Sequence, residues 1–288
     1  MTLNDDLSEY AVPLTHHSWG PIDDSSCELS TDVQTQFHEK GYAVGSAKIG
    51  AELLAKLLSD LDVLMQPGHP GDHLWHEYHT NESTNPDTIL FHALGAWRIR
   101  QSFHDLLWHP AITVPAKQLL KSPVHFWHDQ LFCKPAHHGG VVAWHQDYSY
   151  WTRTTPMQHL TCWIALEDAS VDNGCLHYIP GSHKWELLPM TGLAGDMSSI
   201  KRVLNERQWQ TFQSPEPIEL EAGQVVFHHP LTIHGSFENR TDRSRKAAVV
   251  NMIGDSVTSN SDEPLLEGIP VIPKGELLRN NFFPLLRP

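Results

Sequence analysis

Apolar residues recur with two different periods along the chain, a helical period in its first part and a strand period in its second. In residues 51–65 the leucines stand three or four positions apart, the spacing of one face of an α-helix. These leucines are Leu53, Leu54, Leu57, Leu58, Leu61 and Leu64. Further helices are expected over residues 31–40, 102–108 and 111–120. Residues 66–97 are rich in His, Pro, Gly and Asn, and we expect them to form a long loop near the mouth of a site.

From residue 124 onward the apolar residues alternate with polar ones in short runs, which is typical of β-strands. After one early strand at 41–46, the predicted strands are 124–134, 141–145, 159–166, 175–179, 218–221, 224–228, 232–237 and 246–253. Turn residues such as Asp172-Asn173-Gly174 and Pro180-Gly181-Ser182 separate them. Eight short strands in sequence indicate a closed or sandwiched β domain.

The patterns therefore predict a mainly β protein with flanking helices, organised as a single domain over residues 1–288. Within it we expect an N-terminal arm (1–29), mostly helical support with the loop (30–123), the β core (124–254) and a C-terminal extension (255–288). An insertion at 184–217, with a helix over 198–212, interrupts the core and is a candidate lid.

Charge and cysteine content narrow the class of protein. The 288 residues include 34 acidic and 20 basic ones, a formal charge of −14, which disfavours nucleic-acid and anionic membrane partners. The four cysteines form no C-x-x-C pair, and no apolar run approaches the roughly 20 residues that span a bilayer. With an acidic N-terminal segment in place of a signal peptide, we expect a cytoplasmic protein.

Three residues form a candidate metal site. His145 and Asp147 stand two positions apart at a strand end, so both side chains project from one face. His234, on a later strand, completes a two-histidine, one-carboxylate set, although His228 and His229 compete with it on sequence alone. Such a set leaves positions open on Fe(II), whereas structural zinc sites fill a closed tetrahedron. The protein contains 21 histidines, so H-x-D alone is a weak signal.

Several longer motifs occur together and in order between residues 124 and 250. They are Lys134-Pro135, WHQD at 144–147, WIALEDASVDNGCL at 163–176, IPGSH at 179–183 and HGSFENRTDRSRKA at 234–247. In these motifs the chain resembles the phytanoyl-CoA dioxygenase (PhyH) family of Fe(II)/2-oxoglutarate-dependent oxygenases. The resemblance implies a double-stranded β-helix (jelly-roll, cupin-like) core.

The resemblance also implies the cofactors and their residues. It places Fe(II) on His145, Asp147 and His234, with 2-oxoglutarate and O2 as co-substrates. Arg245 would hold the 2-oxoglutarate carboxylate through its planar guanidinium. Residues Gln130, Trp163 and Ser236 fall where family members line the co-substrate pocket, and Arg98 or Arg100 is a candidate for one further basic contact. The positions that rim the substrate cavity are Tyr148, Tyr150, Trp151 and Arg153.

The expected reaction is hydroxylation, or desaturation or cyclisation, of a small organic molecule, coupled to decarboxylation of 2-oxoglutarate to succinate and CO2. A cupin-like, non-redox metal hydrolase or isomerase is an alternative, as is a jelly-roll ligand-binding module. The substrate does not follow from the family, because fold and cofactor chemistry persist while pockets change. Organic acids, amino-acid derivatives, phosphonates and secondary metabolites are all compatible with the sequence.

Overall fold

The structure is a computed structural model that describes residues 6–15 and 22–288. The N-terminal arm expected over 1–29 lies partly outside these ranges. The helices are α1 Thr31–Lys40, α2 Ala51–Leu64, α3 Ala96–Ile99, α4 Gln101–Leu106, α5 Pro110–Leu120 and α6 Glu206–Phe212, and the short 3-10 helices are η1 Leu7–Glu9, η2 Asp24–Cys27, η3 Asp72–Leu74, η4 Asp147–Tyr150, η5 Ser182–Lys184 and η6 Ser199–Arg202. The strands are β1 Tyr42–Val44, β2 Glu77–His79, β3 Phe91–Leu94, β4 Val124–Lys134, β5 Val142–His145, β6 Thr154–Thr155, β7 His159–Ala165, β8 Leu176–Tyr178, β9 Glu216–Ile218, β10 Val225–His228, β11 His234–Ser236, β12 Arg245–Gly254, β13 Thr258–Ser259 and β14 Leu285–Arg287.

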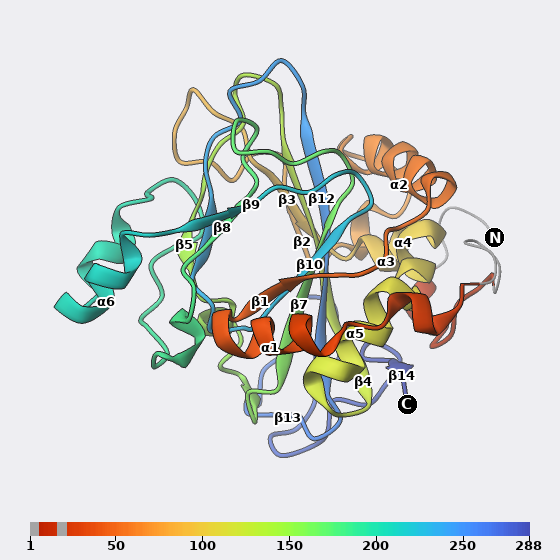
Figure 1. Ribbon diagram of the computed structural model, residues 1–288. Coiled ribbons are helices and arrows are strands. Elements are labelled where there is room, and N and C mark those ends of the chain that lie inside the picture. Colours follow the sequence, from red (N-terminus) through yellow and green to blue (C-terminus); the bar gives the residue numbers. More distant parts are fainter. Residues whose placement is uncertain (1–5, 16–21) are drawn as a thin grey trace.

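Two antiparallel sheets form the core (Figure 1). The large sheet has the order β1-β10-β7-β12-β4-β3-β2, with β14 also paired to β4. The small sheet has the order β5-β11-β8-β9. Buried side chains from both sheets, including Trp163 and Val249 of the large one and Val142 and Leu176 of the small one, pack into one cluster, so the sheets face each other. The fold is mainly β with flanking helices, as predicted, and neither sheet closes on itself.

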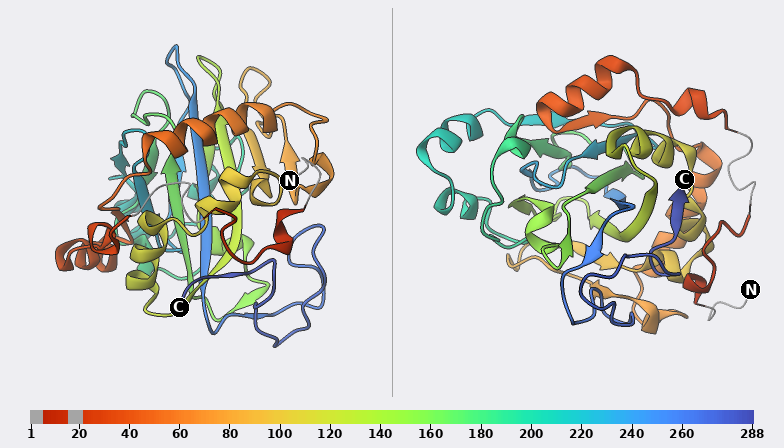
Figure 2. Two further views of the ribbon diagram at one scale, coloured as in Figure 1. Left: turned by 90° about the vertical axis from the view of Figure 1, so that its right-hand side faces the viewer. Right: turned by 90° about the horizontal axis from the view of Figure 1, so that it is seen from below.

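Helices cover the outer face of the large sheet (Figure 2). In α2 the leucines predicted to form an apolar stripe separate into fully buried Leu53, Leu57, Leu61 and Leu64 and half-buried Leu54 and Leu58. Strands of the sheet alternate to meet them: in β7, Cys162 and Ile164 face the helices, whereas Trp163 faces the small sheet. The helical support thus fixes which side chains of the large sheet point inward.

Local chemistry defines the ends of α1. The Ser30 side chain accepts a hydrogen bond from the Val33 backbone N–H, which caps the N-terminus. Gly41 ends the helix in the left-handed region at φ 90°, a conformation that glycine adopts without steric cost. The chain turns there directly into β1, and Tyr42 pairs with His228 of β10.

Three sequence predictions were wrong in extent. Residues 66–97 are not one loop, because β2 and β3 extend the large sheet beyond β4. The helix predicted over 198–212 is interrupted after η6, and α6 begins only after Asn205, whose side chain forms a reciprocal capping box with Gln208. The strand predicted at 218–221 lies at Glu216–Ile218, with one isolated bridge at Leu220.

One irregularity of the large sheet shapes its inner face. Asn251 of β12 pairs with His128 of β4, but the next residue, Met252, pairs with Phe126. Trp127 is therefore the extra residue of a β-bulge, which reverses the alternation of β4 at this point. As a result both Trp127 and His128 reach the space between the sheets. The C-terminal extension runs across this end of the molecule (Figure 2) and packs on Trp127 through Phe283.

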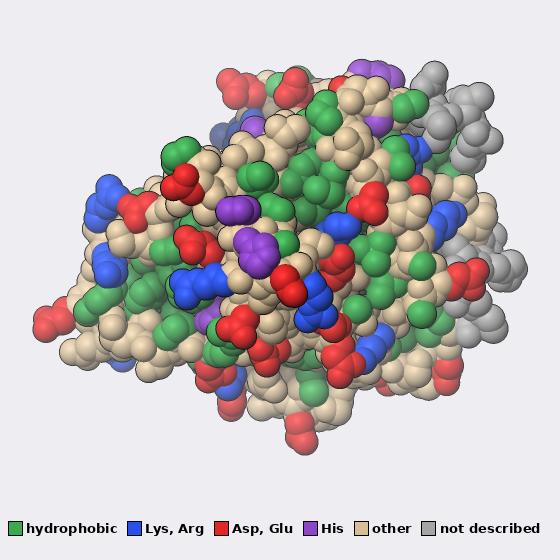
Figure 3. Space-filling model, turned by 90° about the horizontal axis from the view of Figure 1, so that it is seen from above, with side chains coloured by type: hydrophobic (Ala, Val, Ile, Leu, Met, Phe, Trp, Pro, Cys, Tyr) green, Lys and Arg blue, Asp and Glu red, His purple; other side chains and the backbone are tan. Residues whose placement is uncertain are grey.

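The cysteines, the helices and the charges on one face of the surface complete the description of the fold. All four cysteines are buried and unpaired. Within the described ranges, no helix combines the length and the apolar character needed to cross a bilayer. The face drawn in Figure 3 carries acidic and basic side chains interspersed with hydrophobic ones.

Candidate metal centre and its cavity

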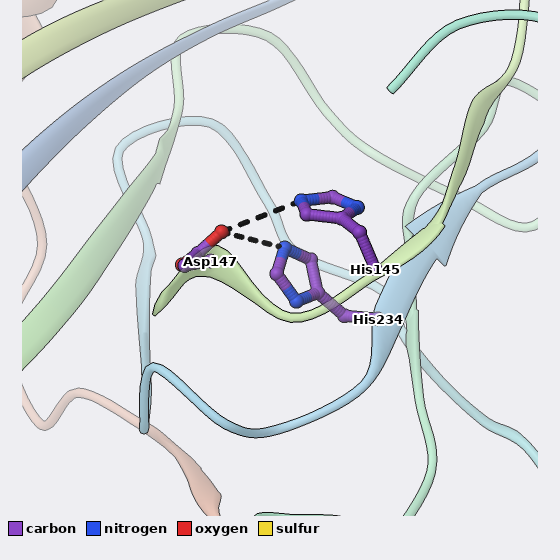
Figure 4. A group of neighbouring side chains, drawn as sticks. All are labelled: His145, Asp147 and His234. Carbon is purple, nitrogen blue, oxygen red and sulfur yellow. Dashed lines mark ion pairs between the residues drawn. The ribbon is translucent and has the colours of Figure 1, made fainter. Parts of the chain in front are cut away.

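The two histidines of the predicted metal site face each other across paired strands. His145 is the last residue of β5 and His234 the first of β11, and the two are direct partners in the antiparallel ladder. Their ring centroids are 4.3 Å apart. Figure 4 shows both rings directed toward Asp147, the first residue of η4, which Gln146 alone separates from β5.

Asp147 completes the group. Its Oδ1 lies 3.3 Å from Nε2 of His145 and 3.6 Å from Nε2 of His234. One ligand atom from each of the three residues lies within 4.8 Å of the others. Burial on its own raises the pKa of Asp147, but the histidines around it outweigh burial and hold the pKa well below its usual range. The carboxylate is therefore ionised, as metal ligation requires.

Backbone carbonyls orient both imidazoles. Nδ1 of His145 lies 2.7 Å from the Ala143 carbonyl oxygen, and Nδ1 of His234 lies 3.0 Å from that of Thr232. With the proton on Nδ1 donated to these carbonyls, each Nε2 keeps its lone pair free toward the shared space. Burial, and then the neighbouring histidines, lower the pKa of His234 well below its ordinary value, which keeps the ring neutral.

A third histidine contacts the carboxylate without belonging to the ligand group. Nε2 of His228 lies 3.0 Å from Oδ2 of Asp147, and the Thr161 hydroxyl donates to the same oxygen at 2.6 Å. The Tyr178 hydroxyl lies 2.9 Å from Nδ1 of His228. Oδ2 is thus occupied by two protein donors, which leaves Oδ1 for a metal. His229 does not line this cavity and accepts from the Leu231 backbone N–H.

Arg245 lies in the same cavity as the three candidate ligands. Its side chain is 1% exposed, and its guanidinium lies 5.4 Å from the Trp163 ring centroid. Its one described hydrogen bond, from Nη1 to the Phe132 carbonyl, is 3.5 Å long, and Nε has no hydrogen-bond partner among the described residues. Burial lowers the pKa of Arg245 only to about 10, so the group stays charged. A buried cation with unused donors indicates an anionic ligand.

The other predicted co-substrate residues surround this guanidinium. Trp163, Ser236 and Gln130 all line the cavity. The Ser236 hydroxyl is buried with no hydrogen-bond partner in the described chain. Gln130 of β4 and Trp163 of β7 lie on either side of Val249 in the large sheet, because both pair with it.

The four predicted substrate residues separate into two groups. Tyr150, Trp151 and Arg153 line the cavity. The Arg153 guanidinium also donates to the backbone carbonyls of Pro264 and Leu265, at 2.8 and 2.9 Å. Tyr148 does not line the cavity, because its hydroxyl donates to the Thr154 carbonyl at 2.7 Å and its ring packs near His159.

Neither candidate for a further basic contact reaches the cavity. Arg98 binds Asp6 with Nη2 at 2.5 Å and the Leu74 carbonyl with Nη1 at 3.1 Å. Arg100 is buried elsewhere and is absent from the cavity wall. Arg245 is thus the one buried arginine among the described residues that faces this space.

The cavity has a volume of 210 Å³ and includes residues that the sequence did not single out. This volume lies below the roughly 300–1,000 Å³ of sites for drug-sized ligands, which favours small occupants. The additional wall residues are Glu77, Glu82, His92, Leu94, Trp127, His128, Phe132, Val142, Thr161, Leu176, Leu193, Val249, Leu265 and Leu266. Glu77, Glu82 and His92 come from the segment expected to be a loop at the site mouth, and Leu193 comes from the insertion.

Comparison with known proteins identifies the family. Residues 37–247 match the phytanoyl-CoA dioxygenase (PhyH) family. The chain belongs to this family. The matched range is more than half of the chain and contains His145, Asp147, His234 and Arg245. The family predicted from the sequence motifs is confirmed.

Two curated relatives are dioxygenases named for different substrates. A probable phytanoyl-CoA dioxygenase of Caenorhabditis elegans is 32% identical over 189 residues, which cover 61% of this chain and 60% of that protein. A probable alpha-ketoglutarate-dependent hypophosphite dioxygenase of Stutzerimonas stutzeri is 25% identical over 236 residues, which cover 77% of this chain and 78% of that protein. The chain thus spans less than two thirds of the length of the nematode PhyH relative.

Solved structures share the fold. The crystal structure of SnoK, a non-heme alpha-ketoglutarate-dependent carbocyclase from nogalamycin biosynthesis, is similar with a TM-score of 0.71 at 23% identity, covering 92% of this chain and 98% of that one. The predicted jelly-roll core is confirmed by this similarity together with the two facing sheets.

Proposed function

We propose that this PhyH-family chain is an Fe(II)- and 2-oxoglutarate-dependent dioxygenase that hydroxylates, or otherwise oxidises, a small organic molecule and converts 2-oxoglutarate to succinate and CO2. The observation that carries the proposal is the meeting of two features in one cavity. His145, Asp147 and His234 converge on one point, and a buried Arg245 with unused donors lies in the same space.

The residues fit Fe(II) and 2-oxoglutarate. Two imidazoles and one carboxylate are the donor set of a facial triad, which leaves coordination positions for other ligands. In our proposal Arg245 pairs with the distal carboxylate of 2-oxoglutarate, and Ser236, Gln130 and Trp163 line that carboxylate's pocket. When bound, the iron, 2-oxoglutarate and O2 supply the oxidising chemistry.

The chain itself supplies placement and shielding. The Thr161 and His228 donors hold Asp147 in one orientation, so the ligand geometry is set before a metal binds. Trp151 and Tyr150 line the same cavity as the candidate ligands and are proposed to position the substrate. Apolar side chains such as Phe132, Leu176 and Val249 line part of the cavity and limit water there, which protects a reactive centre from side reactions.

A non-redox hydrolase or isomerase with the same three ligands would leave Arg245 without a role. A jelly-roll binding module would leave both the ligand group and Arg245 unexplained. The unused donors of a fully buried guanidinium favour the 2-oxoglutarate proposal over both alternatives.

The experiment is a succinate assay under defined metal conditions. The full chain, reconstituted with Fe(II) without oxygen, is mixed with 2-oxoglutarate, O2 and a panel of organic acids, amines, amino-acid derivatives and phosphonates. We expect Fe(II)- and O2-dependent succinate that a substrate in the panel stimulates, and we expect its loss in His234→Ala but not in His229→Ala. Equal succinate formation by His234→Ala and the wild type would contradict the proposal.

A further inference from the structure

The mouth of the cavity, on the side of β2 and β3, carries an acidic group that the proposed oxygenase chemistry does not use. Glu77 and Glu82 both line the cavity, together with His92 of β3. Arg153 also lines the cavity, and two of its nitrogens already donate to carbonyls of the C-terminal extension. The mouth therefore carries more negative than positive charge.

Backbone contacts fix Glu82 in place. Its N–H donates to the Leu90 carbonyl at 2.8 Å. The side chain of the preceding Asn81 accepts from the backbone N–H groups of Ser83 and Leu90, at 2.9 and 3.0 Å, and donates to the Thr88 carbonyl at 3.1 Å. The segment thus presents the Glu82 carboxylate from a preorganised turn, which reduces the entropy lost on binding.

His92 is a buried polar group with one ring nitrogen left without a partner. Its side chain is 3% exposed and stacks on Phe132 with ring centroids 4.4 Å apart. Nδ1 lies 2.7 Å from Oε2 of Glu82, so the two side chains pair with each other. Nε2 of His92 has no hydrogen-bond partner in the described chain. A buried polar atom of this kind is normally satisfied, so Nε2 indicates a missing ligand.

The acidic group and the metal site act on the same space. Burial raises the pKa of Tyr150 to about 12, and the charges of Asp147 and then Glu82 add to this rise. Tyr150 packs against His145 with ring centroids 6.0 Å apart. The Tyr150 ring therefore lies beside the metal site and lines the same cavity as Glu82.

We propose that the substrate carries a protonated amine or a similar small organic cation, which binds to the Glu82 carboxylate beside His92 and places its apolar part toward the metal site. This inference rests on the proposed function in taking the cavity as the substrate site. An ionised carboxylate in a partly enclosed cavity binds an ammonium group through charge-assisted hydrogen bonds. The neighbouring aromatic wall, which includes Tyr150 and Trp151, adds cation–π attraction.

The charges expected around the bound co-substrate also favour a cationic substrate. Fe(II), the Asp147 carboxylate and the 2-oxoglutarate dianion together carry one negative charge, which the Arg245 guanidinium balances. An anionic substrate would then meet the carboxylates of Glu77 and Glu82, against the guanidinium of Arg153, two nitrogens of which already donate to backbone carbonyls. Selection against anions follows from this excess of negative charge as much as from attraction for a cation.

The test uses three ligands of similar shape and different charge: butylammonium, 1-butanol and butanoate. Their dissociation constants are measured by ligand-observed NMR with the full-length chain, both without metal and with Fe(II) and 2-oxoglutarate under nitrogen. We expect butylammonium to bind at least about tenfold more tightly than the other two. A factor of this size corresponds to the contribution of one hydrogen bond to a charged group. Equal or tighter binding of 1-butanol or butanoate overturns the inference without any variant.

Variants then locate the preference. Glu82→Gln removes the charge at nearly constant shape, and we expect it to weaken butylammonium binding by roughly ten- to hundredfold. Glu82→Asp should retain most of the preference, and Glu52→Gln, an exposed change in the first turn of α2, should retain all of it. An unchanged preference in folded Glu82→Gln overturns the assignment.

Binding and turnover separate this inference from the proposed function. If butylammonium binds in a Glu82-dependent way but the panel yields no oxygen-dependent succinate, the cation site stands and the oxygenase proposal is wrong. If succinate forms with neutral or anionic compounds and butylammonium binds no better than butanol, the oxygenase proposal stands and the cation site is wrong.

Discussion

His145 and His234 are direct partners in the ladder between β5 and β11, and their rings are 4.3 Å apart. The spacing of the proposed iron ligands is therefore a property of strand register, because each ring extends from a fixed position on its own strand. Their Nδ1 atoms are held by backbone carbonyls two residues earlier in the same segments, those of Ala143 and Thr232. Strand pairing and backbone carbonyls thus position the two histidines. Asp147, in contrast, is held by the side chains of Thr161 and His228.

Replacement of His228 should weaken metal binding without removing a ligand. His228→Leu deletes the donor to Oδ2 of Asp147, so the carboxylate loses one of the two contacts that orient it. We expect Fe(II) affinity to fall by about ten- to hundredfold, the usual effect of losing such an orienting partner. Anaerobic titration calorimetry measures the change. Tyr178→Phe, which removes only the contact to His228, is the matched control and should have a smaller effect; wild-type affinity in His228→Leu would refute the role.

Replacement of Arg245 should act on the co-substrate. Lysine keeps the charge but loses the planar, two-pronged donor geometry, so Arg245→Lys should raise the KM for 2-oxoglutarate by about tenfold or more. Arg243 is exposed, two residues away, and Arg243→Lys should leave this KM unchanged. Titration of 2-oxoglutarate in the succinate assay decides between them. A larger effect at Arg243 than at Arg245 would relocate the carboxylate contact.

Helix α2 supports the large sheet from outside, and its leucines allow a stability test. Leu57 is fully buried, so Leu57→Ala should lower the free energy of unfolding by about 2–5 kcal/mol. Its half-buried neighbour Leu58 offers the same chemical change, and Leu58→Ala should cost clearly less. Thermal or urea denaturation measures both variants. Similar losses at the two positions would show that the inward face of α2 is assigned incorrectly.

The longest strand of the large sheet was predicted closely from the sequence, because eleven residues rich in apolar and aromatic side chains are recognisable without their partners. The strand predicted at 124–134 is β4, with the same bounds. β2 and β3 were missed because each is only three or four residues long and is stabilised by pairing in the sheet rather than by its own composition. The split helix before α6 was missed because the cap at Asn205 overrides an otherwise continuous pattern.

Only part of the cavity wall could be predicted from the sequence. Asp147 and Arg245 could be identified because they lie in long motifs with the spacing of the family. His228 could be named only as a competitor for the metal, since nothing local distinguishes a ligand from a residue that holds a ligand's carboxylate. Glu82 and His92 carry no motif at all, and they reach the cavity only because β3 pairs with β4.

The most direct test of the central claim follows the atoms of labelled dioxygen. A 2-oxoglutarate-dependent dioxygenase puts one atom of O2 into succinate and uses the other to oxidise its substrate. The wild-type chain with Fe(II), 2-oxoglutarate and 18O2 is therefore expected to form succinate that carries one 18O atom, as mass spectrometry measures it. Samples without iron, and the His234→Ala variant, are expected to form none. Succinate without 18O from the wild type, or equal labelled succinate from His234→Ala, would contradict the assignment of this centre.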